Sequence, residues 1–92
     1  MNLADQLNEW CDAAGIPGGK RRQSNLRKKL AERGVQRTRA AVWRWFTDGD
    51  SAGRPDDEAI AALVAELALD VEGELRLRKM PVGRSPADAN AA

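Results

Sequence analysis

The sequence predicts a compact all-α domain of four to five helices. Apolar residues recur at spacings of three and four in successive segments, which is typical of helices with one buried face. Glycine, proline and helix-capping residues separate these segments. The chain of 92 residues, with 42% hydrophobic and 32% charged residues, suits a single domain with a modest core. We therefore expect one domain over residues 1–78 and a disordered tail over residues 79–92.

The first helix is expected to begin after Asn2, a capping residue, and to end at Gly15 and Pro17. Its apolar positions are Leu3, Leu7, Trp10, Cys11 and Ala14. The glycines and proline of the next stretch, IPGGKRRQ, predict a loop.

A second helix, LRKKLAER, is expected to start from a cap at Ser24 or Asn25 and to close at Gly34. Leu26 and Leu30 form its apolar stripe. Its other faces carry the basic residues Arg27, Lys28, Lys29 and Arg33.

The third helix is expected to run from a cap at Thr38 to about Thr47. At the usual ~100° per residue, its apolar residues gather on one side. That inward side carries Val42, Trp45 and Phe46. The outward side carries Arg39, Ala40, Trp43 and Arg44.

The fourth helix follows a turn over residues 48–53. Pro55 is expected at its first helical position, and acidic residues come directly after it, where the helix dipole favours negative charge. The helix should end near Leu69, with an apolar face of Ile60, Leu63, Val64 and Leu67.

The segment VEGELRLRKM has two interpretations. Leu75 and Leu77 alternate with charged residues, which fits a short C-terminal strand or arm that pairs with a second subunit. A helix fits the same short run equally well. Under the first interpretation, Leu75 and Leu77 form a dimer interface.

Charge is strongly segregated along a chain whose net charge is only +1. Residues 20–46 hold ten basic residues and one acidic residue, whereas residues 47–75 hold nine acidic residues and one basic residue. A basic block of this kind indicates a surface that binds a polyanion. The alternative is a solvated basic face that the acidic block neutralises.

Several classes of function are excluded or disfavoured by composition. One cysteine and no histidine exclude an intramolecular disulfide, a zinc site of the usual kind and histidine-dependent catalysis. Pairs of acids such as Asp56 and Asp57 are explained by helix capping. We expect no enzyme activity, no cofactor, no metal and no small-molecule ligand. Without a long apolar run or a signal-peptide pattern, we expect no membrane partner and a cytoplasmic location.

The outward residues of the third helix suit contact with DNA bases. The guanidinium fork of Arg39 or Arg44 matches the two acceptors on the guanine edge in the major groove. Ala40 would let the helix lie close to the bases, and Trp43 would contact sugars or methyl groups. The alternatives are a partly buried ring for Trp43 and plain surface charge for the two arginines.

The second helix and the loop before it are expected to contact the DNA backbone. Basic side chains there would neutralise phosphates and give affinity without sequence information. The candidate backbone contacts from these two segments are Lys20, Arg21, Arg22, Ser24, Asn25, Arg27 and Lys28, and Arg37 joins them from the connection before the third helix.

The sequence resembles the phage-repressor-like helix-turn-helix family of the Cro/Xre type. The resembling stretches are LAERGV (30–35), AVWRW (41–45), RP (54–55) and DDEAIAALVAELALD (56–70). The resemblance covers about residues 3–75 and implies a lambda-repressor-like helix-turn-helix domain. The spacing from Gly34 to Val42 is longer than is usual in that family, and the loop before the second helix is longer and more basic.

The resemblance also implies a function. It assigns base contacts to Arg39, Ala40, Trp43 and Arg44, and a backbone contact to Thr38. It implies a homodimeric transcription regulator, usually a repressor, on palindromic operators of double-stranded DNA whose half-sites lie ~34 Å apart. A phage, prophage or similarly compact genetic system would be the expected source.

Two other functions remain open from the residues. The arginine-rich segment 20–39 could enter a structured RNA. The acidic fourth helix or the ELRLRKM segment could instead dock on another protein.

Overall fold

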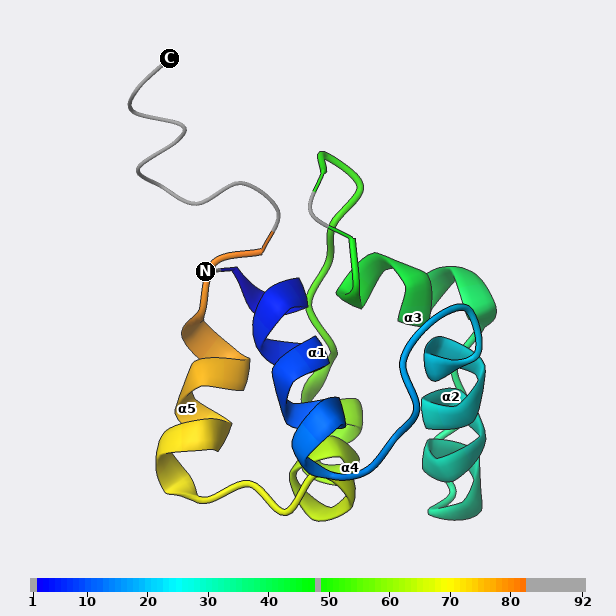
Figure 1. The fold of residues 1–92 in the computed structure, drawn as a ribbon. Helices are drawn as coiled ribbons and strands as arrows, with labels where there is room; N and C mark the ends of the chain where they lie inside the picture. Colours follow the sequence, from blue (N-terminus) through cyan, green and yellow to red (C-terminus); the bar gives the residue numbers. More distant parts are fainter. Residues whose placement is uncertain (1, 48, 83–92) are drawn as a thin grey trace.

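A computed structural model describes residues 2–47 and 49–82 and shows five α-helices with no strand in these ranges (Figure 1). The predicted all-α class is therefore confirmed. The helices are α1 Leu3–Ala13, α2 Arg22–Glu32, α3 Arg39–Trp45, α4 Asp57–Glu66 and α5 Val71–Lys79.

The helices surround one hydrophobic core. Helix α2 packs against α3 and α4, α4 also packs against α5, and α1 packs against α3. In Figure 1, α5 lies on one side of α1 and α4, while α2 and α3 lie on the other. The largest fully buried side chains come from all five helices: Leu3, Leu7, Cys11, Leu26, Leu30, Val42, Leu63 and Leu77.

Helix α1 begins as its sequence predicts. The Asn2 side chain accepts a hydrogen bond from the Asp5 amide at 3.0 Å, and the Asp5 carboxylate accepts one from the Asn2 amide at 3.4 Å. This reciprocal arrangement is a capping box, which satisfies amides that have no partner inside the helix. The helix ends before Gly15, whose φ of +78° is a left-handed conformation that favours glycine.

Helix α2 starts at Arg22, so the predicted cap at Ser24 or Asn25 is wrong. The reason is a long-range anchor. Arg22 is only 6% exposed, and its guanidinium group donates to Asn8 Oδ1 at 3.0 Å and to the Ile16 carbonyl at 2.8 Å. It also donates to the Pro17 carbonyl at 3.2 Å and pairs with the carboxylate of Asp12. Arg22 thus fastens the loop and the first turn of α2 to α1.

The connection between α2 and α3 follows the prediction at both ends. Gly34 follows Arg33, the C-cap residue of α2, and adopts a φ of +85°, and Val35 is buried in the core. The Thr38 hydroxyl accepts from the Ala41 amide at 3.1 Å and so caps α3. Helix α3 ends at Trp45, two residues before the expected end at Thr47.

Helix α4 begins later and ends earlier than the sequence suggests. Asp56 is its N-cap, so Pro55 precedes the helix instead of forming its first turn. The helix stops at Glu66, because Ala68 turns the chain with a φ of +52°. Of the predicted apolar face, Ile60, Leu63 and Leu67 are buried.

Residues 71–79 form a helix, so the strand or arm is not observed. The Asp70 side chain accepts from the Gly73 amide at 2.8 Å and caps α5. Gly73 lies so close to the preceding turn that an added Cβ would sit 3.1 Å from Leu69 Cβ. Leu77 is fully buried in the core, and the prediction that it forms a dimer interface is wrong. Leu75 remains 47% exposed.

The folded domain continues past the predicted boundary at residue 78. The Leu3 amide donates to the Pro81 carbonyl at 2.8 Å, and Met80 and Val82 pack against the core. The Arg54 guanidinium donates to the Leu77 carbonyl at 2.6 Å and to the Met80 carbonyl. Residues 79–82 therefore belong to the domain, and residues 83–92 of the expected tail lie outside the described residues.

Candidate nucleic-acid interface

Helix α3 has one buried side and one exposed side, as predicted. Val42 and Trp45 are 1% and 4% exposed and join the core. The outward positions Arg39, Ala40, Trp43 and Arg44 are all exposed. Because the inward residues are held by the core, the backbone of α3 presents the outward residues in a fixed order.

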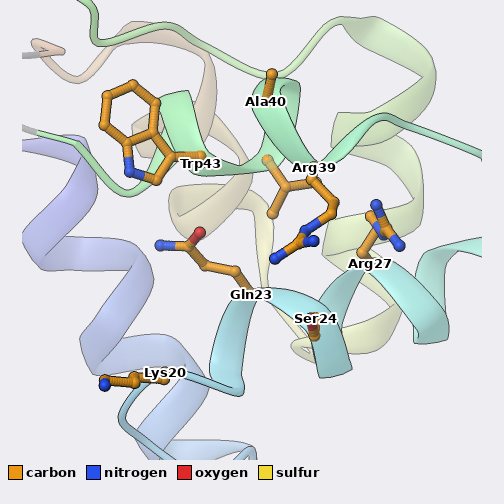
Figure 2. Close-up of a pocket in the computed structure, with 8 residues that line it drawn as sticks. Lys20, Gln23, Ser24, Arg27, Arg39, Ala40 and Trp43 are labelled. Carbon is orange, nitrogen blue, oxygen red and sulfur yellow. The ribbon is translucent and has the colours of Figure 1, made fainter.

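A hollow of about 290 Å³ lies between α2 and α3. Figure 2 shows side chains from both helices around it. Gln23 of α2 and Trp43 and Arg39 of α3 face the same space. The lining residues are Lys20, Gln23, Ser24, Arg27, Arg39, Ala40, Val42 and Trp43. The hollow therefore combines cationic, amide, hydroxyl and aromatic groups, which are the groups that contact phosphates and base edges.

A second hollow, of about 520 Å³, continues the same surface along α2 to the connection before α3. It shares Ser24 and Arg27 with the first hollow, so the two form one continuous face. Its other lining residues are Lys28, Ala31, Gln36 and Arg37. We call the residues that line the two hollows, together with Arg44, the basic face.

Most cations near the basic face have no acidic partner. Among the described residues, no ion pair is formed by Lys20, Arg21, Arg27, Lys28, Arg39 or Arg44. Unpaired cations on one side of a small domain produce a positive potential that attracts a polyanion.

Other basic residues of the 20–46 block are held by acids. Arg33 Nε lies 2.6 Å from Glu66 Oε1. Arg37 binds both carboxylate oxygens of Asp56, at 3.0 and 2.7 Å. The hydrogen bonds from Arg37 lower the pKa of Asp56. The acidic block therefore neutralises part of the basic block. Arg33 and Arg37 thus follow the alternative interpretation, in which the acidic block neutralises the basic residues.

The structure separates the predicted contact residues into three groups. Lys20, Ser24, Arg27 and Lys28 lie on the basic face with the outward residues of α3. Arg22 is buried and its donors are used inside the domain, so its predicted phosphate contact is wrong. Arg37 also lines the second hollow, but it is paired with Asp56. Three further predicted backbone contacts line neither hollow: Arg21, Asn25 and Thr38.

Gln23 is a candidate contact that the sequence interpretation missed. The sequence places Gln23 in the loop IPGGKRRQ, whereas α2 already begins at Arg22. As the second residue of α2, it points toward the space between the two helices (Figure 2). A glutamine amide both donates and accepts, which matches the two groups on an adenine edge in the major groove.

The described residues show no metal-ligating cluster, no reactive thiol and no membrane-spanning helix. No cluster of three or more potential metal-ligating side chains occurs there. Cys11 is buried, and burial raises the pKa of its thiol to about 11, so the group is neutral at ordinary pH. No described helix combines the length and the apolar character that crossing a bilayer requires.

Comparison with known proteins finds no matching family model, no matching curated protein and no matching solved structure.

Proposed function

We propose that this protein is a sequence-specific double-stranded DNA-binding transcription regulator that inserts α3 into the major groove. The observation that carries the proposal is the outward side of α3, where two unpaired arginines flank Ala40 and a half-exposed indole. The expected mode of action is that of a homodimeric repressor on a palindromic operator, as the resemblance implies.

The dimensions and chemistry of α3 suit this role. An α-helix with its side chains is about 10–12 Å across, and the major groove is about 12 Å wide, so α3 fits into it. Arg39 and Arg44 would bind guanine edges, each through two parallel hydrogen bonds. The small Ala40 allows a close approach, and the Trp43 ring supplies apolar contact with a thymine methyl or a sugar.

Helix α2 and the loop before it supply the backbone contacts. Lys20, Arg27 and Lys28 lie on the basic face beside α3 and have no acidic partner among the described residues. Their charges suit phosphates on either side of the groove that α3 occupies. Such contacts set the orientation of the protein, while the side chains of α3 and Gln23 read the sequence.

The RNA alternative has less support. It requires the arginines of segment 20–39 to be available together, but three of them are engaged within the domain. Arg22 is buried against α1, Arg33 pairs with Glu66, and Arg37 pairs with Asp56.

In vitro selection from random duplex DNA tests the proposal. We expect recovery of a palindrome, and replacement of Arg39 by alanine should relax the preference at one position of each half-site. Lys29→Ala is the matched control, because Lys29 is an exposed cation of α2 that lines neither hollow. Selection of no sequence, equal effects of both variants, or preferential binding of hairpin RNA at every salt concentration would overturn it.

A further inference from the structure

Two carboxylates reach the edge of the basic face from the start of α4. The guanidinium group of Arg37 binds both oxygens of Asp56, at 3.0 and 2.7 Å, and Arg37 Nη2 lies 3.4 Å from Glu58 Oε1. Arg37 also lines the second hollow, which runs along α2 to the connection before α3. A cation of the basic face is therefore held by acids that belong to a different helix.

The hydrogen-bond donors of Arg37 are almost all used inside the domain. A guanidinium group has five N–H donors. Nε and Nη2 donate to the two acids, and Nη1 donates to the Gln36 carbonyl at 2.6 Å. A phosphate therefore cannot make a two-point contact with Arg37 unless it displaces one of these acceptors.

The rest of the second hollow suits a phosphate. It is lined by two cations that form no ion pair among the described residues, and by a hydroxyl and an amide: Arg27, Lys28, Ser24 and Gln36. Phosphate oxygens accept hydrogen bonds from all of these groups. Asp56 and Glu58 thus place negative charge beside a hollow that is otherwise cationic and polar.

The pairing is open to exchange because both acids face solvent. The side chains of Asp56 and Glu58 are 55% and 65% exposed, and that of Arg37 is 22% exposed. Ion pairs at such exposure stabilise a protein only slightly, so a phosphate can displace them. Arg22 has no such freedom, because its donors face the interior of the domain.

We infer that the carboxylates of Asp56 and Glu58 are an internal substitute for a DNA phosphate. In the free protein they hold Arg37, and when a duplex binds, a phosphate takes their place on the guanidinium group. The displaced carboxylates then lie beside that phosphate and repel it.

The contact is therefore autoinhibitory. Breaking the ion pair and placing the acids beside the phosphate together impose a modest cost on every duplex, whatever its sequence. This cost suppresses binding that depends on phosphates alone, because such binding has no base contacts to offset it. The inference deepens the proposed function and rests on it for the identity of the polyanion as duplex DNA.

A double-mutant cycle on the full chain tests the inference. The probe is a duplex of arbitrary sequence, and fluorescence anisotropy at low salt measures the affinity. Asp56→Asn combined with Glu58→Gln removes both charges at nearly constant size and should tighten binding about fivefold, because Arg37 is released and the repulsion is removed. In an Arg37→Ala background the same pair of substitutions should tighten binding only about twofold, because only the repulsion is then removed.

Equal tightening in both backgrounds would show that the acids act through net charge alone and would overturn the inference. The absence of any tightening would overturn it as well. Circular dichroism confirms that each variant folds.

The matched control removes two charges from a different arginine. Asp57 and Glu74 both contact Arg78 of α5, at 2.9 and 3.9 Å. In Figure 1, α5 lies on the side of the molecule away from α2 and α3. Asp57→Asn with Glu74→Gln should therefore tighten binding no more than the net charge requires, about twofold. A fivefold effect of this control would also contradict the inference.

Salt dependence gives a second measurement. In the Asp56→Asn, Glu58→Gln background, Arg37→Ala should make the slope of log affinity against log salt concentration shallower by about one, because one phosphate contact is lost. An unchanged slope would show that the released Arg37 does not reach a phosphate, and the inference would fall.

Failure of this inference is distinguishable from failure of the proposed function. Recovery of a palindrome by selection, together with a cycle that shows no coupling to Arg37, would remove the inference alone. A cycle with the expected coupling, but no selected sequence, would leave the inference standing and refute sequence-specific binding. A chain that binds no duplex even at low salt would refute both.

Discussion

The guanidinium group of Arg37 spans the carboxylate of Asp56, with Nε 3.0 Å from Oδ1 and Nη2 2.7 Å from Oδ2. Arg37 lies just before α3, and Asp56 is the N-cap of α4. The two-point contact therefore joins the entrance of the proposed recognition helix to a helix of the core. It also removes Arg37 from the set of freely available phosphate ligands.

This contact predicts a dependence of stability on acid pH. Hydrogen bonds from Arg37 lower the pKa of Asp56 below its ordinary value of 3.8. A carboxyl group whose pKa is lowered by folding stabilises the protein above its ordinary pKa, and this stabilisation is lost as pH falls through the lowered value. We expect the free energy of unfolding to decline less steeply below pH 4 in Asp56→Asn, which removes the carboxylate and keeps the size of the side chain, than in the original chain. Urea denaturation over this range measures the difference, and identical slopes would contradict the prediction.

Arg22 is predicted to be structural. Its replacement by methionine removes the donors for Asn8 Oδ1 and the Ile16 and Pro17 carbonyls and should lower the free energy of unfolding by roughly 2–4 kcal/mol. The neighbouring Arg21→Met serves as the control, because Arg21 is exposed and should change stability little. Chemical denaturation compares the two variants, and equal stabilities would show that the anchor is dispensable.

The unpaired cations of α2 predict the salt dependence of DNA binding. Each phosphate contact contributes about −0.9 to the slope of log affinity against log salt concentration. Arg27→Ala and Lys28→Ala should each make this slope shallower by about one and weaken specific and non-specific DNA alike. Fluorescence anisotropy at several salt concentrations gives the slopes. A changed sequence preference with an unchanged slope would place these side chains on bases instead.

The two tryptophans of α3 are predicted to have different roles. Trp45 is 4% exposed, and Trp45→Ala should cost about 3–5 kcal/mol of stability by leaving a cavity in the core. Trp43 is 48% exposed, and Trp43→Ala should leave stability within about 1 kcal/mol while weakening binding to the selected duplex. Thermal denaturation and binding measured on both variants separate the roles. A loss of stability in Trp43→Ala would indicate that the Trp43 ring has a mainly structural role.

The sequence could predict features that depend on neighbouring residues. The caps at Asn2 and Thr38 are local hydrogen bonds, and the division of α3 into two sides follows from helical spacing alone. The start of α2 could not be predicted in this way, since the anchor of Arg22 lies in α1 and in the preceding loop. The pairing of Arg37 with Asp56 is equally non-local, and it decides which cations of the basic block remain unpaired.

The segment around Leu75 and Leu77 shows how short patterns mislead. Alternation over four residues fits a strand, but the Asp70 cap and the burial of Leu77 beside α4 make the segment helical. Once it is helical, the two leucines point to opposite sides. Only Leu75 then remains available at the surface, and the candidate interface changes from a strand edge to a helix face.

The adjacent residues Gly53 and Arg54 reach the ends of two different helices. The Gly53 amide donates to the Arg44 carbonyl in α3 at 3.1 Å, while the Arg54 side chain holds the last carbonyls of α5. Neighbouring residues of one extended segment cannot readily separate from the fold one at a time. The C-terminal end of α3, the proposed recognition helix, and the C-terminal end of α5 should therefore open in the same local unfolding event. A substitution that destabilises one of these ends should then also destabilise the other.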